Sequence, residues 1–150
     1  MDVTVTINDT EYERDVEPRK LLIHFIRDDL DLTGSHIGCD TGNCGACSIL
    51  LDGVLVKSCM LLAVQANGAQ IETVEGLADE GALTKLQQSF SDHHALQCGY
   101  CTPGMLMSAT ALLRSNPHPS DDEIKKALQG NICRCTGYWN IFEAVKAAAE

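Results

Sequence analysis

The sequence lacks a segment that could cross a membrane, and it lacks the start of an exported protein. Its longest apolar runs, such as residues 105–113, are interrupted by Ser and Thr and are shorter than the roughly 20 residues that a membrane-spanning helix needs. The first residues do not follow the basic, apolar, small-residue order of a secretory signal. We therefore expect a protein of the cytoplasm without a transmembrane segment.

Basic residues are also scarce. Lys and Arg total 11 against 21 Asp and Glu, which gives a formal net charge of −10 at pH 7. This charge repels phosphate backbones, and no basic patch with interleaved aromatic residues offsets it. Nucleic acid is therefore not an expected partner. With only 4 prolines and 45% hydrophobic residues, the 150-residue chain has the composition of one compact unit or two very small ones.

Cysteine is the abundant residue, with 8 in the chain. An even number would suggest disulfides in a secreted protein, but thiols inside the cell are kept reduced. Metal ligation is therefore the leading explanation. The cysteines divide four and four between the two halves of the chain, and small domains commonly need a metal or disulfides to be stable. One metal centre in each half would account for both observations.

The two halves have different hydrophobic periods. In the first half, alternating residues predict two hairpins and a further strand, and a spacing of three and four predicts one helix. These segments are the hairpin of residues 2–7 and 11–16, the helix 19–30, the hairpin 48–59 about Asp52 and Gly53, and the strand 69–74. This combination predicts a small α+β domain of the β-grasp, plant-type ferredoxin-like kind.

The second half has the period of helices. The predicted helices are residues 83–92, 103–114, 121–128 and 141–149. Thr102 before Pro103, Ser120 with Glu123, and Asn140 with Glu143 have the pattern of helix starts. We expect a four-helix bundle, and the predicted domains are 1–75, a connector 76–82, and 83–150.

The first cysteine quartet has the spacing of a plant-type [2Fe-2S] site. The stretch CDTGNCGAC (39–47) is followed after eleven residues by a fourth cysteine. Glycines at 38, 42 and 45 would let the loop adopt positive φ and let backbone N–H groups approach sulfur. The predicted ligands are Cys39, Cys44, Cys47 and Cys59. A zinc site is the less favoured alternative, because zinc prefers two separated CxxC pairs.

The second quartet is less specific by spacing alone. A CxxC in QCGYCTPG and a CxC in GNICRCTGY would bring four sulfurs together between helix ends, where helix N-termini favour thiolates. The predicted ligands are Cys98, Cys101, Cys133 and Cys135. Structural zinc remains the alternative here.

Together, CDTGNCGAC, the later Cys59, QCGYCTPG and GNICRCTGYWNI resemble the small iron–sulfur subunit of the molybdenum hydroxylases, the xanthine oxidase family. The resemblance covers nearly the whole chain in the order of the family, and all eight ligand positions are filled. Within the family, residues 21–53 and 56–69 are most similar to the small subunit of aerobic, molybdenum-containing carbon monoxide dehydrogenase, which converts CO and water to CO2. Related dehydrogenases of N-heterocycles and aldehydes have similar small subunits.

The resemblance implies a non-catalytic, electron-transfer subunit of an oxidoreductase complex. A large subunit would hold molybdenum with molybdopterin cytosine dinucleotide, a medium subunit would hold FAD, and the assembly would be a dimer of heterotrimers. Electrons would pass from molybdenum to the helical-domain [2Fe-2S] cluster, then to the β-domain cluster, and then to flavin. Gln97 and Cys135 match positions that lie against the pterin. The complex is expected in the cytoplasm, with peripheral binding at the inner face of the cell membrane left open.

Two other functions stay open at this point. A free-standing ferredoxin-like shuttle would explain the first quartet but not the helical half, and a zinc-stapled interaction module would explain both quartets without redox activity. The remaining conspicuous side chains have structural interpretations. His93 and His94 are expected on the surface or at an interface, His24 and His36 in packing or turns, and Met105 and Met107 in the core or facing a partner. Three aromatic residues are expected to shield the second quartet from water: Tyr100, Tyr138 and Trp139.

Overall fold

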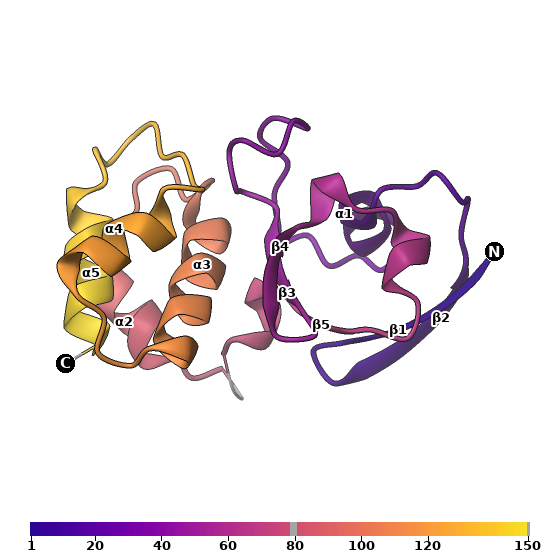
Figure 1. Ribbon diagram of the computed structural model, residues 1–150, viewed down its shortest axis with the longest axis horizontal. Helices are drawn as coiled ribbons and strands as arrows, with labels where there is room; N and C mark the ends of the chain where they lie inside the picture. The colour runs from indigo at the N-terminus through magenta and orange to yellow at the C-terminus, as the bar shows by residue number, and fades with distance from the viewer. Residues whose placement is uncertain (79–80, 150) are drawn as a thin grey trace.

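The computed structural model describes residues 1–78 and 81–149 and has a mixed α+β architecture. A curved sheet formed by the first half of the chain lies beside a group of helices formed by the second half (Figure 1). Helix α3 packs directly against strand β3, so the two halves share a boundary along these two elements. The predicted α+β class is confirmed.

The sheet has five strands in the order β2-β1-β5-β3-β4. Its strands are β1 (Asp2–Ile7), β2 (Thr10–Asp15), β3 (Ser48–Leu51), β4 (Val54–Lys57) and β5 (Gln70–Glu72). β1–β2 and β3–β4 are antiparallel hairpins, while β5 joins them by running parallel to β1 and antiparallel to β3. Both predicted hairpins and the predicted fifth strand are therefore confirmed.

Each hairpin turns on two residues with positive φ. Asn8 and Asp9 have φ values of 49° and 64°, and Asp52 and Gly53 have values of 50° and 79°. Two consecutive positive φ angles are those of a type I′ turn, whose twist matches that of paired strands. These turns fix the strand register, and the β3–β4 register places the residues around two cysteines opposite each other.

The helix predicted over residues 19–30 begins later and changes type. α1 spans only Leu22–His24 and continues as a π-helical segment, η1 (Phe25–Asp29). Leu21 is extended and forms an isolated bridge with Leu62, so the chain cannot be helical before residue 22. The predicted start was therefore wrong by three residues. The buried face of this segment packs into a core shared with the sheet: Val3, Val5, Leu22, Phe25, Ile26 and Ile49.

Three short 3₁₀ helices and four α helices complete the described chain. They are η2 (Ser58–Met60), η3 (Ala63–Ala66), η4 (Val74–Gly76), α2 (Lys85–Asp92), α3 (Thr102–Ser115), α4 (Asp121–Leu128) and α5 (Trp139–Ala149). The four predicted helices of the second half are present and surround a core that includes Met105 and Met107, both fully buried. Within 1–78 and 81–149, none of the helices has the length and apolar character to cross a bilayer.

The helix starts agree with the sequence patterns only in part. The Ser120–Glu123 capping box of α4 is confirmed, since each side chain bonds the backbone of the other residue. The other two predicted caps were wrong. Cys101, not Thr102, precedes α3, and α5 begins at Trp139, which places Asn140 inside the helix. The two assignments differ from the prediction by one or two residues.

Strand β3 connects the two cores because its neighbouring side chains point to opposite faces. Ile49 belongs to the core of the sheet half, whereas Leu50 is buried in the core of the helical half. An ion pair adds to this boundary: both guanidinium N–H groups of Arg114 on α3 bond the Glu72 carboxylate on β5, at 2.5 and 2.7 Å. The two halves therefore pack as one body around β3 and α3.

Candidate iron–sulfur sites

The β3–β4 hairpin brings the last two cysteines of the first quartet together. Cys47 directly precedes β3, and Cys59 lies in η2, just after β4. Because Ser48 pairs with Lys57, the residues that flank the two strands also meet. The backbone N–H and the hydroxyl of Ser58 both donate to the carbonyl of Cys47, at 3.3 and 2.7 Å. Cys47 and Cys59 are buried together with Ile23.

The other two cysteines of this quartet lie in the loop before β3. Backbone N–H groups of Thr41 and Cys44 point at the Cys39 sulfur, at 3.4 and 3.3 Å. Hydrogen bonds from the Thr41 side chain and from these amides lower the pKa of Cys39 to about 6, since they stabilise the thiolate. The predicted inward turn of backbone donors toward sulfur is present in this loop.

Glycine is required at two loop positions for different reasons. Gly45 has a φ of +73°, which L side chains rarely adopt. Gly38 needs space instead, because a Cβ there would lie 2.8 Å from the Cys44 sulfur. The loop is further held by Lys57, whose ammonium group donates to the carbonyl of Gly42 at 2.5 Å. The close approach of backbone to sulfur thus depends on residues without a side chain.

The second quartet lies in the two loops at one end of the helices. Cys98 and Cys101 precede α3, and Cys133 and Cys135 lie between α4 and α5. The sulfurs of Cys98 and Cys135 are 3.5 Å apart, and the thiols of Cys101 and Cys133 interact in the same way. Thr136 donates to the Cys133 sulfur from its hydroxyl at 3.1 Å and from its backbone N–H at 3.5 Å.

Burial and hydrogen bonding act in opposite directions on these thiols. Burial raises the pKa of Cys101 to about 12 and that of Cys47 to about 11. Burial is the largest single effect on Cys133 and acts to raise its pKa, but hydrogen bonds from Thr136, Cys135 and Cys101 together lower the value. Thiolates are the form of cysteine that binds metal. A metal centre that binds to either quartet must therefore displace the protons of these thiols.

The sulfurs of each quartet interact in pairs. Within residues 1–78 and 81–149, no three Cys, His, Asp or Glu side chains gather as ligands of one ion would. The sulfurs meet instead in pairs, Cys39 with Cys44 and Cys47 with Cys59 in the first quartet. A [2Fe-2S] cluster takes four thiolates, two on each iron, so the paired sulfurs are compatible with such a cluster.

Both quartets lie at the same end of the molecule, the upper end in Figure 1. The backbone N–H of Ile132 donates to the carbonyl of Cys44 at 2.8 Å, and Cys44, Cys101 and Cys133 line one common cavity of about 230 Å³. Cys98 and Cys135 are exposed at the surface, and Gln97 is exposed beside them. The second quartet therefore has one buried cysteine, Cys133, one half-buried cysteine, Cys101, and two that are exposed, and Cys98 reaches both the surface and the common cavity.

Two residues of the site, His36 and Asn131, were not assigned to it from the sequence. His36 stacks on Tyr100 with ring centroids 4.5 Å apart and bonds the Tyr100 carbonyl at 2.8 Å, so it bridges the loops of the two quartets. Buried Asn131 bonds Gly45 from the loop between α4 and α5. The Asn in GNICRC was a visible polar residue beside a ligand, but its distant partner is set only by the fold.

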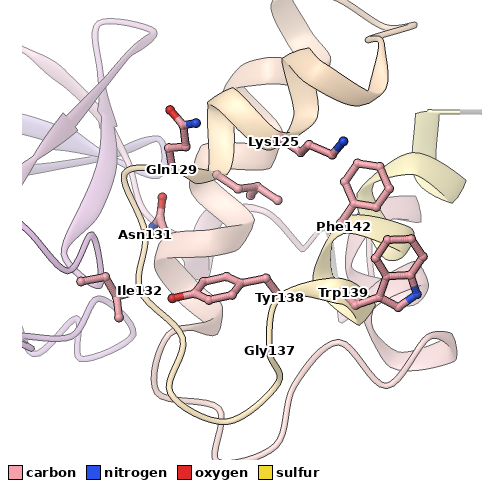
Figure 2. Close-up of a pocket in the computed structure, with 9 residues that line it drawn as sticks. Lys125, Gln129, Asn131, Ile132, Gly137, Tyr138, Trp139 and Phe142 are labelled. Atoms are coloured by element: carbon pink, nitrogen blue, oxygen red, sulfur yellow. The ribbon is translucent and has the colours of Figure 1, made fainter.

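The surface around the exposed cysteines is unusually apolar. Five large apolar side chains near the second quartet are between 41% and 65% exposed: Leu96, Tyr100, Ile132, Tyr138 and Trp139. The expected shielding by Tyr100, Tyr138 and Trp139 is therefore incomplete in the isolated chain. Figure 2 shows a groove of about 420 Å³ on this surface, with Ile132 and Tyr138 on one side and Trp139 and Phe142 on the other.

Comparison with known proteins identifies the family. A family model described as a [2Fe-2S] binding domain matches residues 73–146, which contain the second quartet. The caffeine dehydrogenase gamma subunit of Pseudomonas sp. (strain CBB1) is 50% identical over 150 residues, covering 98% of this chain and 90% of the relative. The small subunit of nicotine 6-hydroxylase from Paenarthrobacter nicotinovorans is 52% identical, covering 97% and 87%. This chain belongs to the small iron–sulfur subunits of the molybdenum hydroxylase family.

Two solved oxidoreductase structures contain the same fold. Quinoline 2-oxidoreductase from Pseudomonas putida 86 matches with a TM-score of 0.97 and 50% identity over 99% of this chain and 93% of the matched chain. Aldehyde oxidoreductase from Desulfovibrio gigas matches with a TM-score of 0.94 and 39% identity. The match covers 99% of this chain but only 17% of that polypeptide, which is much longer.

Proposed function

We propose that this chain relays electrons inside a molybdenum hydroxylase complex, from a molybdopterin centre on a large subunit to FAD on a medium subunit. The observation that carries the proposal is the presence of two paired cysteine quartets on adjoining loops of one small chain. When bound, two [2Fe-2S] clusters would supply one-electron steps between a two-electron donor and a two-electron acceptor. The protein itself would hold, space and insulate them.

The proposed ligands follow the sulfur pairs. Cys39 with Cys44 and Cys47 with Cys59 would each bind one iron of the first cluster, and the second cluster would be bound by Cys98 with Cys135 and Cys101 with Cys133. The donor set supports this assignment because amide and hydroxyl hydrogens already point at the sulfurs of Cys39 and Cys133. Such donors stabilise a negatively charged cluster.

The large subunit is the proposed occupant of the apolar surface around Cys98 and Cys135. An exposed apolar patch of this kind is typical of an interface, and this patch directly surrounds the exposed pair of the second quartet. Gln97 and Cys135 lie on this surface, where they would contact the pterin. The second cluster would therefore receive electrons first, and the first cluster would pass them to flavin.

N-heterocycles are the proposed substrates of the complex. The relatives named above are subunits of enzymes of caffeine and nicotine, and the solved relative is an oxidoreductase of quinoline. Each of these compounds contains a ring nitrogen. Carbon monoxide is a second candidate, favoured by the resemblance of residues 21–53 and 56–69 to the carbon monoxide dehydrogenase subunit, and an aldehyde is a third.

Composition analysis of the native complex tests this function. We expect about four iron atoms and matching acid-labile sulfide per small chain, with molybdenum and flavin on two larger co-purifying chains, and oxidation of an N-heterocycle. Oxidation of CO alone would select the second candidate. A monomer that reduces diverse acceptors would establish the ferredoxin-like shuttle instead, and a colourless zinc protein without sulfide would establish the interaction module.

We also propose a division of the chain at its change of architecture. The β-grasp, ferredoxin-like domain would span residues 1–75, the connector 76–82, and the four-helix-bundle domain 83–150. The strand order with parallel β1 and β5, and the single core shared by α2 to α5, support this division. Residues 79, 80 and 150 lie outside the described residues. A cytoplasmic dimer of heterotrimers is the proposed assembly.

A further inference from the structure

Two consecutive residues of the helical half donate hydrogen bonds to two consecutive carbonyls of the first cysteine loop. The Ile132 N–H donates to the Cys44 carbonyl at 2.8 Å, and the side-chain amide of Asn131 donates to the Gly45 carbonyl at 3.1 Å. Cys44 belongs to the first quartet, and Cys133 follows Ile132 in the second. The bond from Ile132 to Cys44 therefore joins the loops of the two quartets directly beside a predicted ligand of each.

The Asn131 side chain is fixed from the opposite side by helix α3. The Ser108 hydroxyl donates to the Asn131 amide oxygen at 2.7 Å, which leaves the amide nitrogen directed at Gly45. Asn131 is only 5% exposed and Ser108 is buried, so water cannot readily replace either bond. The amide thus connects the helical core to the first cysteine loop through two buried hydrogen bonds.

The loop packs closely against this amide and against α3. A Cβ on Gly45 would lie 2.6 Å from the Asn131 amide nitrogen. A Cβ on Gly104, one turn before Ser108 on the same face of α3, would collide with the Gly45 carbonyl oxygen. Absent side chains at these two positions let the loop lie directly on α3, and Asn131 bonds it there. Figure 2 shows Asn131 and Ile132 close together on the loop between α4 and α5.

We propose that Asn131 is a positioning residue that fixes the distance and orientation between the two cysteine quartets. The proposal rests on the proposed function, in which each quartet holds a [2Fe-2S] cluster. Electron transfer between two centres depends steeply on their separation, so a fixed spacing would be a functional property of this chain. Asn131 touches neither cluster in this proposal and acts through the carbonyl of Gly45.

The test uses Asn131→Asp in the native complex. Aspartate keeps the oxygen that accepts from Ser108 but replaces the donor to Gly45 by an oxygen, which repels that carbonyl. We expect the variant to retain iron and both cluster signals in electron paramagnetic resonance. The magnetic splitting that each reduced cluster imposes on the other should change, since it depends on the cube of their separation and on their orientation. Transfer between the clusters should slow by about tenfold or more.

Asn140→Asp is the matched control. Asn140 also donates its side-chain amide to a backbone carbonyl, that of His94 at 3.3 Å, but it is exposed and lies within the helical half alone. This control should keep the wild-type splitting. Ser108→Ala is the milder second variant, which removes only the bond that orients the Asn131 amide and should change the splitting in the same direction by less.

The outcomes separate a failure of the proposed function from a failure of the positioning role of Asn131. If wild-type complex shows no pair of [2Fe-2S] signals, the proposed function is wrong. If wild type shows both and Asn131→Asp keeps both with unchanged splitting, only the positioning role is overturned. If Asn131→Asp does not assemble, Ser108→Ala decides: a changed splitting with full iron supports the proposal, while unchanged splitting or loss of a cluster signal overturns it.

Discussion

Two threonine hydroxyls lie against cysteine sulfurs, one in each quartet. Thr136 donates to Cys133 at 3.1 Å, and Thr41 bonds the Cys39 thiol in addition to the two backbone amides there. A hydrogen bond to sulfur favours the more negative state of a cluster and so raises its reduction potential. At the scale of single residues, these hydroxyls would therefore set the potential of each proposed cluster separately.

Thr136→Val tests this role because valine keeps the shape of threonine without its hydroxyl. Loss of a hydrogen bond worth about 0.5–1.5 kcal/mol corresponds to a decrease of about 20–60 mV for a one-electron couple. We expect the second-quartet signal to shift downward by this order in a redox titration followed by electron paramagnetic resonance. Thr41→Val should shift only the first-quartet signal. A shift of both signals by either variant would contradict separate tuning.

The grouping of the cysteines was predictable from the sequence, whereas their role as iron ligands stays a prediction. CxxxxCxxC indicated a two-iron site, and the structure places Cys39, Cys44 and Cys47 in one loop with Cys59 brought in by a hairpin. Asn131 was not predictable, because its role depends on Gly45, 86 residues away in the sequence. A single chain sequence contains no local signal for a bond across that separation.

The conformation of the cysteine loop before β3 depends on its glycines, as a comparison of Gly45 with Gly53 in the β3–β4 turn shows. Gly45 and Gly53 have almost the same φ, +73° and +79°, but different surroundings. A Cβ at Gly53 would meet nothing within 4 Å, whereas one at Gly45 would press on Asn131 and on the Gly130 carbonyl. Substitutions at Gly45 and Gly53 therefore separate the free-energy cost of a positive φ from the cost of a steric clash.

Gly53→Ala should therefore cost only the backbone strain of about 1–2 kcal/mol and retain both clusters. Gly45→Ala carries the same strain and must also move the loop between two proposed ligands. We expect it to lose the first cluster's signal and about half of the iron while the second cluster's signal remains. Iron analysis and electron paramagnetic resonance of the two variants measure this. Equal iron content in both would show that the contact at Gly45 is unimportant.

The start of α4 gives a pH-dependent contribution to stability. Hydrogen bonds from the Ser120 backbone and side chain lower the pKa of Glu123 below its ordinary value of 4.5. A lowered folded-state pKa stabilises the folded chain above that ordinary value, and this contribution is lost as pH falls through the lowered one. Glu123→Gln should thus reduce the thermal midpoint at pH 7, and the difference from wild type should shrink toward pH 4.

Exposed Glu11 on β2 provides the control for this comparison. Glu11→Gln should leave the midpoint nearly unchanged at both pH values, because the described hydrogen bonds and ion pairs of the structure do not use its carboxylate. A difference between wild type and Glu123→Gln that stays constant from pH 7 to pH 4 would contradict the role of the ionised carboxylate.

At the level of elements, local patterns predicted the hairpins and helices better than their ends. The I′ turns and the Ser120 cap are decided by neighbouring residues, so the sequence indicated them correctly. The start of α1 depends on the bridge from Leu21 to Leu62, and the early start of α5 places Asn140 where it bonds His94. These ends are set by tertiary contacts that periodicity does not contain.

The two ends of the molecule differ, because the cysteine loops lie at one end only. The cysteine loops gather at the N-terminal ends of α3 and α5, while Thr84 at the start of α2 lies near their C-terminal ends, beside Arg114 and Ala148. The exposed apolar side chains around Cys98 and Cys135 lie at the first of these ends, which is the proposed face toward the large subunit. Leu83, which is also exposed, belongs to the opposite end.

Trp139→Glu tests this orientation of the complex. Trp139 is the most exposed of the apolar side chains around the second quartet, and an aromatic residue at the centre of an interface typically contributes at least about 2 kcal/mol, or about 30-fold in affinity. Glutamate in the first turn of α5 is favourable for the helix, so the fold should persist. We expect both cluster signals to remain and the affinity for the large subunit to fall by about this factor in a titration with the purified partner. Leu83→Glu places the same charge at the opposite end and should bind as wild type does; equal binding by all three chains would place the large subunit on another face.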